Sequence, residues 1–565
     1  MGDEVRDWDR RVRRKRRLRG VALGAVIATA ATFGVFGTAG ANAPSQGGGG
    51  KPKSGGSITY GLEAPTTNFC LPNAQLAISG IVVTTAIYDT LTVPDNGGKY
   101  VPYLAESVNP SPDYMSWTIK LRPNIQFQNG EALDANAVKQ NLDAYAGKNS
   151  AVSAPLFGFV MSNVDSVNVV DPMTVQVNMK TPWVEFDQYL WSTGRLGIVA
   201  PAQLNSPNCQ TNMIGTGPFK LQSFDPVTGN VDVVKNPNYW RKGFPYLDEI
   251  KFVPVPDGSQ RFTQFQGSAL DVTHDSVGRD LTQYQGLGSQ SSITKQPNGR
   301  MEITHDLINV TRPPFDDANA RKAIAEGIDR NAYNSLVNDG KARLANGVFD
   351  TNVEGYMSNA GYPKFNPKDA KKLVQQYKAA HGGTFEFSYQ STNDQLAIDS
   401  ARFLKAQLAK VGITVNLPQP VDQPTVIDQA IGGNVDAFGW RNYPGLVGDT
   451  MYVWFYGTTQ PNSQGGRNPV NFNFVNDPQL NQDLDQARAE PDPAKRAQLY
   501  QDFNKRLTST YTDFWDWYTP WFVVTKPNIH GVLGPNLPDA NGNTGSDKPT
   551  PVLAGYHQLL GLWKR

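Results

Sequence analysis

The chain has 565 residues, 39% of them hydrophobic and 10% aromatic, so it can bury a large interior and is too long for a single core. The formal net charge is +1, but residues 1–43 carry nine basic and four acidic side chains, which leaves the remainder with a net charge of −4. A chain without a basic face is not typical of nucleic-acid-binding proteins, and we expect no nucleic acid among its partners.

The N-terminus has the pattern of an export signal. Residues 6–19 are strongly basic, residues 20–37 form an uncharged run rich in Ala, Val and Gly, and Ala41-Asn42-Ala43 offers small residues at the spacing of a cleavage site. The alternative is an uncleaved membrane anchor, although a run of about 18 residues rich in Ala and Gly makes a weak span. We expect residues 1–43 to be a signal peptide that places the protein in the periplasm or cell envelope, or on the extracellular face. The export route stays open.

A Gly-rich stretch, residues 44–56, reads as a flexible linker, and the folded part is expected to begin at Ser57. The chain has two cysteines, Cys70 and Cys209. In an exported protein an isolated pair indicates a disulfide, the alternative being two buried free thiols. We expect the disulfide.

The stretch from Trp117 to Tyr145 predicts a strand, a turn, a second strand and a capped helix. Side chains alternate before and after a Pro-Asn break, Asn129-Gly130 makes a tight turn, and Asp134 stands where a helix N-cap belongs. Apolar residues then recur at helical spacing. The stretch also reads LR-x-x-[IV]-x-F-x-x-G-x-x-[LF]-x-A-x-x-V, which resembles a segment of the large solute-binding receptors of ABC importers, the oligopeptide/dipeptide or family 5 type.

Later segments extend the resemblance over residues 57–565. Residues 215–219 (GTGPF), 236–240 (NPNYW) and 248–252 (DEIKF) follow one another as in that family. Residues 313–330 (PPFDDANARKAIAEGIDR) match a further family segment, and their Asp317 is expected to cap a helix. Members often carry a lipid-anchored Cys after the signal segment; none follows here, which leaves the mode of surface retention open.

The resemblance implies an α/β fold of the two-lobe periplasmic-binding-protein kind, large and type II-like, with an extra subdomain inserted in the first lobe. Lobe one is expected to gather residues 57–82, 206–306 and 527–565, the insert residues 83–205, and lobe two residues 307–526. The chain would cross between the lobes twice, and these crossings would act as a hinge that lets the lobes close on a ligand.

The sequence offers no sign of catalysis or of a cofactor. The five histidines are far apart, no two of them stand at metal-ligand spacing, and two cysteines cannot build a zinc or iron–sulfur site alone. Neither a G-x-S-x-G elbow nor a phosphate-binding G-x-x-x-x-G-K occurs. We expect no metal and no enzyme activity. The alternative, a secreted glycan-acting hydrolase, would also be acidic and rich in Trp and Tyr, but no sequence feature favours it.

The candidate ligand site follows a predicted strand that ends at Ala437-Phe438. Loops at strand ends line the clefts of open α/β folds. Aromatic side chains here would cover planar or apolar ligand groups, and Arg441 would take a carboxylate in bidentate fashion. Interlobe packing is the alternative for Trp440, and a structural ion pair for Arg441. The candidate residues are Trp440, Arg441, Asn442, Tyr443, Asp449 and Trp454.

In the peptide-binding members an Asp of this loop holds the α-amino group of the peptide. The nearest position here is Asn442, which is neutral and supplies no counter-charge; Asp449 would supply one if the loop turns back. Farther along the chain, Trp521 is expected in the core more than in the pocket.

Together these features and the resemblance predict an extracytoplasmic substrate-binding receptor of an ABC transporter. It would capture a peptide or a similarly sized polar solute in the interlobe cleft, deliver it to the membrane permease, and work as a monomer.

Overall fold

A seven-stranded sheet forms the centre of lobe one in the computed structural model, which describes residues 50–565 except 67–68, 73–76, 150–151, 153, 155, 443–446 and 458–466. The first strand, β1 (Ser57–Leu62), buries Ile58, Tyr60 and Leu62 at the two-residue spacing of a strand. It lies parallel to both of its neighbours, β10 (Glu249–Pro254) and β11 (Val272–Asp275). The order is β12-β18-β11-β1-β10-β9-β8, where the other strands are β8 (Phe219–Phe224), β9 (Val231–Lys235), β12 (Ser292–Lys295) and β18 (Phe522–Thr525).

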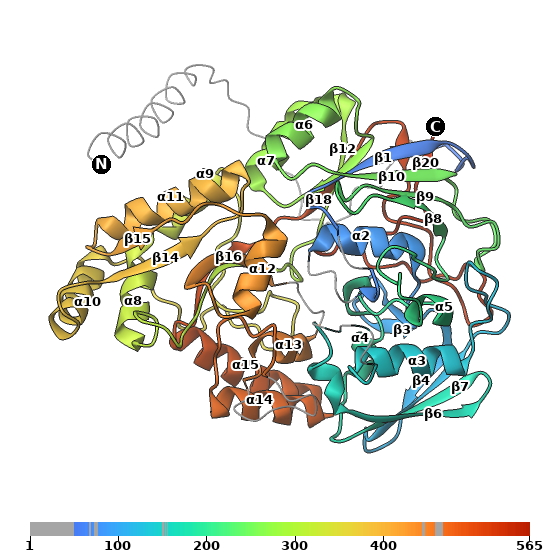
Figure 1. Ribbon diagram of the computed structural model, residues 1–565, viewed down its shortest axis with the longest axis horizontal. Helices are drawn as coiled ribbons and strands as arrows, with labels where there is room; N and C mark the ends of the chain where they lie inside the picture. The colour runs from blue at the N-terminus through green and yellow to red at the C-terminus, as the bar shows by residue number, and fades with distance from the viewer. Residues whose placement is uncertain are drawn as a thin grey trace, which may run out of the picture. The chain divides into compact units, whose positions relative to one another are not determined.

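Three helices belong to this lobe: α2 (Ile78–Ile87), α6 (Gly258–Gln266) and α7 (Gly278–Gly286) (Figure 1). The boundary expected at 82/83 lies inside α2. Nine of the ten residues of α2 are buried, because this helix lies between the sheet and the insert that follows it. Asp257 caps the N-terminus of α6, because its side chain accepts a hydrogen bond from the Gln260 amide at 2.9 Å.

The insert carries a four-stranded antiparallel sheet in the order β4-β5-β7-β6, covered by α3 (Ala135–Tyr145). The expected first strand, turn and capped helix are confirmed: Ile119 and Leu121 are buried, and Asp134 accepts from the Ala137 amide at 2.8 Å. The expected second strand does not form, because its residue Gln126 makes only an isolated bridge with Ala132. The remaining elements of the insert are β2 (Thr92–Pro94), β3 (Tyr100–Pro102), β4 (Ala105–Pro110), β5 (Ser116–Leu121), β6 (Val164–Asp171), β7 (Thr174–Met179), α4 (Phe186–Tyr189) and α5 (Pro201–Leu204).

Lobe two is built on a five-stranded mixed sheet, in the order β15-β14-β16-β13-β17. Its strands are β13 (Ile303–Ile308), β14 (Glu386–Gln390), β15 (Thr414–Asn416), β16 (Ala437–Asn442) and β17 (Asp513–Tyr518). Its helices are α8 (Ala318–Gly327), α9 (Arg330–Asn338), α10 (Pro367–Ala380), α11 (Gln395–Ala409), α12 (Gln423–Ile431), α13 (Met451–Phe455), α14 (Pro478–Ala489) and α15 (Pro493–Ser509). The expected cap of α8 is confirmed, since Asp317 accepts from the amides of Asn319 and Ala320.

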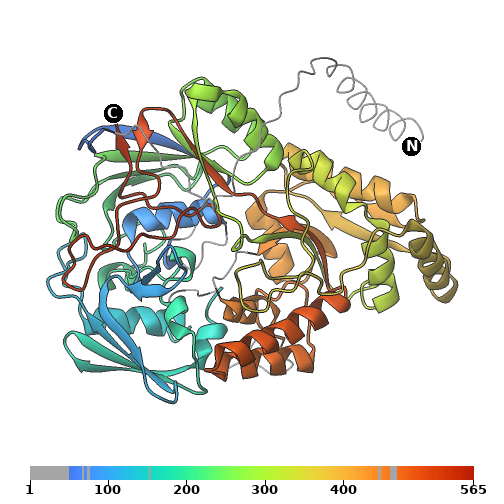
Figure 2. The ribbon, with the colours of Figure 1, turned by 180° about the vertical axis from the view of Figure 1, so that it is seen from behind.

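The chain passes between the two sheets through residues 296–302 and residues 519–521, which we call the crossings (Figure 2). The crossings are bonded to each other: the Gln296 amide donates to the Trp521 carbonyl at 2.9 Å, and the Thr519 amide donates to the Glu302 carbonyl at 2.8 Å. The boundary expected at 306/307 therefore lies inside β13 of the lobe-two sheet. The boundary expected at 526/527 lies just after β18 of the lobe-one sheet.

After β18 the chain returns along lobe one and ends in a two-stranded ribbon, β19 (Ile529–His530) with β20 (Trp563–Lys564). The Lys564 ammonium donates to the Ser57 carbonyl at 3.1 Å, so the last strand lies beside the first. Within the part of the chain that the structure describes, every helix is too short or too polar to cross a lipid bilayer.

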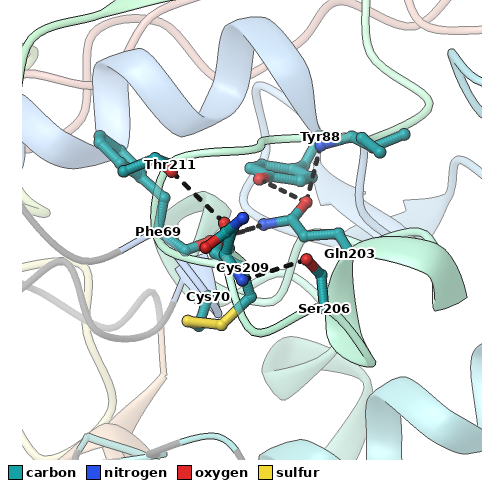
Figure 3. The surroundings of a disulfide bond; sticks show 9 residues. Phe69, Cys70, Tyr88, Gln203, Ser206, Cys209 and Thr211 are labelled. Atoms are coloured by element: carbon teal, nitrogen blue, oxygen red, sulfur yellow. Dashed lines mark hydrogen bonds between the residues drawn. A yellow bond between two sulfur atoms is a disulfide. The ribbon is translucent and has the colours of Figure 1, made fainter.

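The expected disulfide joins Cys70 to Cys209, with 4.6 Å between their Cα atoms (Figure 3). The amide of Gln203 lies beside it and donates to the carbonyls of Phe69 at 2.8 Å and Cys209 at 3.1 Å. The Tyr88 hydroxyl in turn donates to Gln203 Oε1 at 3.0 Å. The bond therefore ties the loop after β1 to the segment that leads from the insert back into lobe one.

Candidate functional site

The carboxyl ends of three strands meet where the two lobes face each other. Strand β16 of lobe two ends at Asn442, while β1 and β11 of lobe one are followed by Glu63 and Ser276. Ligands of open α/β sheets bind outside the carboxyl ends of strands, so this junction is the candidate site.

Arg441 is the side chain that spans the junction. From lobe two its guanidinium donates to Glu63 Oε1 at 2.6 Å and to the Ser276 hydroxyl, both in lobe one. It also lies 4.8 Å above the ring of Trp521, and its Nε is 3.9 Å from Glu302 Oε1. Burial lowers the pKa of Arg441, but Glu63 and Glu302 outweigh burial and raise it, so the guanidinium stays charged. The side chain is 29% exposed, which leaves part of it open to solvent.

The two crossings contribute an acid and an indole to the same place. Glu302 accepts a hydrogen bond from the indole of Trp521. Burial raises the pKa of Glu302 to about 7, against the opposing effect of Arg441. Trp521 is almost fully buried, and it packs edge-on against His274 in the lobe-one sheet. Both crossings are therefore in direct contact with Arg441.

The two predicted tryptophans lie inside lobe two instead. Trp440 contacts Phe472 with ring centroids 5.3 Å apart, and Trp454 lies 6.4 Å from Trp440. Both indoles are buried. In strand β16 the side chain of Trp440 therefore points into the lobe, whereas the side chain of its neighbour Arg441 points to the junction.

Asn442 is buried at the end of β16 and lines a small cavity. Glu302 and Asp350 supply further polar groups of its wall, and Phe349 and Met451 supply apolar ones. The cavity measures about 10 Å³, roughly the room of one water. Tyr443, the next predicted residue, lies outside the described residues.

Asp449 is fully buried and already bound on both oxygens. Arg488 donates to Oδ1 at 2.9 Å and to Oδ2 at 3.0 Å, and the Trp183 indole donates to Oδ2 at 2.9 Å. Its main-chain carbonyl accepts from the Tyr189 hydroxyl at 2.8 Å. Asp449 thus joins lobe two to the insert, and the structure does not bring it to Arg441.

Sequence reasoning missed Glu63, Ser276 and Glu302. The strand expected to end at Ala437-Phe438 begins at Ala437 and runs to Asn442, so Arg441 lies inside β16 and not in a loop after it. Glu63 and Ser276 directly follow strands β1 and β11, so a search of strand ends would have found them. Nothing local marks Glu302, because it acquires its neighbours only where the crossings meet. Among the described residues, no group of three or more His, Cys, Asp or Glu side chains is placed to hold a metal ion.

Comparisons with known proteins agree with this architecture. The family described as bacterial extracellular solute-binding proteins, family 5 Middle, matches residues 99–464. The glutathione-binding protein GsiB of Pectobacterium atrosepticum is 26% identical over 459 residues, which cover 79% of this chain and 84% of that protein. GsiB of Escherichia coli K12 is 27% identical over 430 residues, covering 74% of this chain and 80% of that protein.

Solved structures share the fold. The binding protein DppA of Helicobacter pylori, in complex with the peptide STSA, superimposes with a TM-score of 0.78 at 20% identity and covers 91% of this chain and 98% of its own. AgaA of A. tumefaciens R10, in complex with agropinic acid, gives a TM-score of 0.76 at 24% identity, over 90% of this chain and 99% of its own.

Proposed function

Since the chain belongs to the bacterial extracellular solute-binding proteins of family 5, the receptors of ABC importers, we propose that it captures a peptide or a similarly sized polar solute between its lobes and delivers it to a membrane permease. It acts outside the cytoplasm as a monomer, with residues 1–43 as its export signal. It binds the solute and does not transform it. The names of similar proteins support this size class, since they include binders of glutathione, agropinic acid and the peptide STSA.

The observation that carries the proposal is the bridge made by Arg441. This partly exposed cation reaches from lobe two to Glu63 in lobe one, 378 residues away in the chain, and it touches both crossings. A carboxylate of the solute would take the place of Glu63 on the guanidinium fork, because Arg recognises carboxylates in bidentate fashion. Binding at this point would act directly on the hinge.

Three of the predicted residues receive a different role in the proposal. Trp440 and Trp454 maintain the packing of lobe two, and Asp449 holds the insert. Asn442, which is neutral and buried at the end of β16, leaves this position without a counter-charge. A buried ammonium without a counter-charge is costly, so the site should discriminate weakly for a free amino terminus.

Mass spectrometry of solute released on denaturation, followed by calorimetry, tests the proposal. The calorimetric probes are glutathione and the peptide Ser-Thr-Ser-Ala, the latter with free and with acetylated amino terminus. We expect Arg441→Gln to weaken binding at least tenfold, since a charge-assisted hydrogen bond is lost. Arg402→Gln is the matched control, because Arg402 is 65% exposed on α11.

Three results would contradict these assignments. Failure of the wild type to bind or release any solute would overturn the receptor function, and turnover of the bound solute would show an enzyme. If acetylation abolishes binding and Asp449→Asn loses the free peptide, Asp449 is the amine anchor and the role given to Asn442 is wrong.

A further inference from the structure

Apart from the contact of Arg441 with lobe one, lobe two also contacts the insert. The residues of the crossings take no part in the hydrogen bonds described below. Helix α4 and the residues before it come from the insert, and the segment around α13 with helix α14 comes from lobe two. Four side chains form its centre: Trp183, Tyr189, Asp449 and Arg488. We call this group the insert latch.

Charge lies at the middle of the latch. Asp449 and Arg488 form a bidentate ion pair with side chains 1% and 3% exposed. The guanidinium is stacked between two rings, 4.3 Å from the centre of Trp183 and 3.4 Å from that of Tyr452. Both members of the ion pair belong to lobe two, so separation of the lobes would leave the pair intact and expose it to water.

The insert supplies the hydrogen bonds that exist only while the two parts touch. The Trp183 indole donates to Asp449 Oδ2 at 2.9 Å, the Tyr189 hydroxyl donates to the Asp449 carbonyl at 2.8 Å, and the Val184 amide donates to the Arg488 carbonyl at 3.0 Å. Beside these hydrogen bonds, Nε of Arg496 in lobe two lies 3.5 Å from Oε1 of Glu185 in the insert. These contacts would all break if lobe two moved away from the insert.

Lobe one holds the insert independently of lobe two. The Gln128 amide donates to the Phe219 carbonyl at 2.6 Å, and Tyr103 and Tyr239 share a hydrogen bond of 3.0 Å. The Trp240 indole donates to the Asp89 carboxylate at 2.8 Å. The insert therefore moves with lobe one, and a rotation about the crossings opens the latch.

We infer that Trp183 and Tyr189 are positioning residues: the insert latch favours the closed arrangement of the lobes before any solute binds, and so contributes to how tightly solute is held. The inference rests on the proposed function, in which the lobes open and close. Closure takes the Asp449–Arg488 pair out of water, and this costs free energy unless the remaining polar groups are hydrogen-bonded. The indole and the hydroxyl provide these bonds, while the surrounding rings bury apolar area.

Small-angle X-ray scattering of the full chain without added solute tests the inference. Trp183→Phe keeps most of the apolar packing but removes the hydrogen bond to an ionised acceptor, which should shift the ratio of closed to open molecules toward open by about tenfold or more. We expect its radius of gyration to exceed that of the wild type. Tyr189→Phe should also raise the radius of gyration. If Trp183→Phe does not fold, Tyr189→Phe takes its place in the test.

Trp240→Phe is the matched control, because it removes a Trp–Asp hydrogen bond of nearly the same length within one rigid part. Its thermal stability should fall while its scattering stays that of the wild type. The inference is overturned if the curves of wild type, Trp183→Phe and Tyr189→Phe superimpose, or if Trp240→Phe expands as much as Trp183→Phe. Either result leaves the receptor function standing, provided that the wild type binds solute in calorimetry.

Discussion

At the scale of single residues, neighbouring positions in one strand serve different purposes. Trp440 packs inside lobe two, and Arg441 reaches lobe one. Their alternation follows from strand geometry, and it separates two residues that the sequence had grouped in one binding loop. Asp449 illustrates the converse, since a carboxylate predicted near the ligand is fully occupied by Arg488 and Trp183.

Asp89 should make stability depend on pH. Burial raises its pKa to about 7, although Trp240, Arg241, Tyr239 and Thr216 all favour the charged form. A carboxyl whose pKa is raised by folding binds its proton more tightly in the native state. The extra stability that the native state gains from holding this proton is thus complete below about pH 4, and it is lost as the pH rises through 7. Between pH 5 and pH 8 this loss amounts to up to about 3 kcal/mol.

Urea unfolding of Asp89→Asn at pH 5 and pH 8 measures the effect. The loss of stability between these pH values should be smaller in the variant than in the wild type. Part of the loss should remain in the variant, because burial also raises the pKa of Glu302 to about 7 and that of Asp306 to about 6. Asp113→Asn serves as control, because hydrogen bonds from Ser111 and Met115 hold the pKa of this exposed carboxyl below its usual range. An unchanged difference in Asp89→Asn would show that Asp89 does not titrate in this range.

At the scale of elements, local signals placed the starts of α3 and α8. Aspartate side chains accept hydrogen bonds from first-turn amides at α3, α8 and α15, and Asn366 does so at α10. These caps are readable in the sequence because the capping residue and its amides lie within three positions. The disulfide is different, since it joins elements 139 residues apart.

Removing the disulfide should lower stability by about 4–5 kcal/mol, since a cross-link across so long a loop restricts the unfolded chain. Guanidinium unfolding of Cys70→Ser/Cys209→Ser against the wild type measures the loss. The Gln203 hydrogen bonds to Phe69 and Cys209 should keep the native loops in place. Reductant should destabilise the wild type and leave the double variant unaffected. Alkylation of two thiols in denatured, unreduced wild type would show that the bond does not form.

At the scale of the whole folded unit, Pro52–Arg565, the chain crosses between the lobes at two places, and a third tie runs through the insert. The crossings carry Glu302 and Trp521, which touch Arg441. Under the proposed function a solute held at Arg441 would act on the crossings, while the insert latch joins lobe two to the insert at a separate contact.

Solute binding should raise the melting temperature, by mass action on a native state that alone holds the solute; a hundredfold excess over Kd corresponds to about 2.7 kcal/mol. It should also lower the radius of gyration. The decrease should be larger for Trp183→Phe than for the wild type, because the variant starts from a more open population. Scattering and calorimetry on the same samples check both effects. Curves that superimpose with and without a tightly bound solute, in both proteins, would contradict closure.

The sequence by itself determined the strand over residues 116–121, the helix caps at Asp134 and Asp317, the cysteine pair and the family. Each depends on residues close together in the chain or, for the cysteines, on there being two of them in the sequence. Only the tertiary structure decided the partners of the charged side chains. Arg441 meets Glu63 across 378 residues, and Trp183 meets Asp449 across 266. A carboxylate takes whichever donors the packed lobes bring within about 3 Å, and that distance is set by how whole sheets and helices pack, which no local pattern encodes.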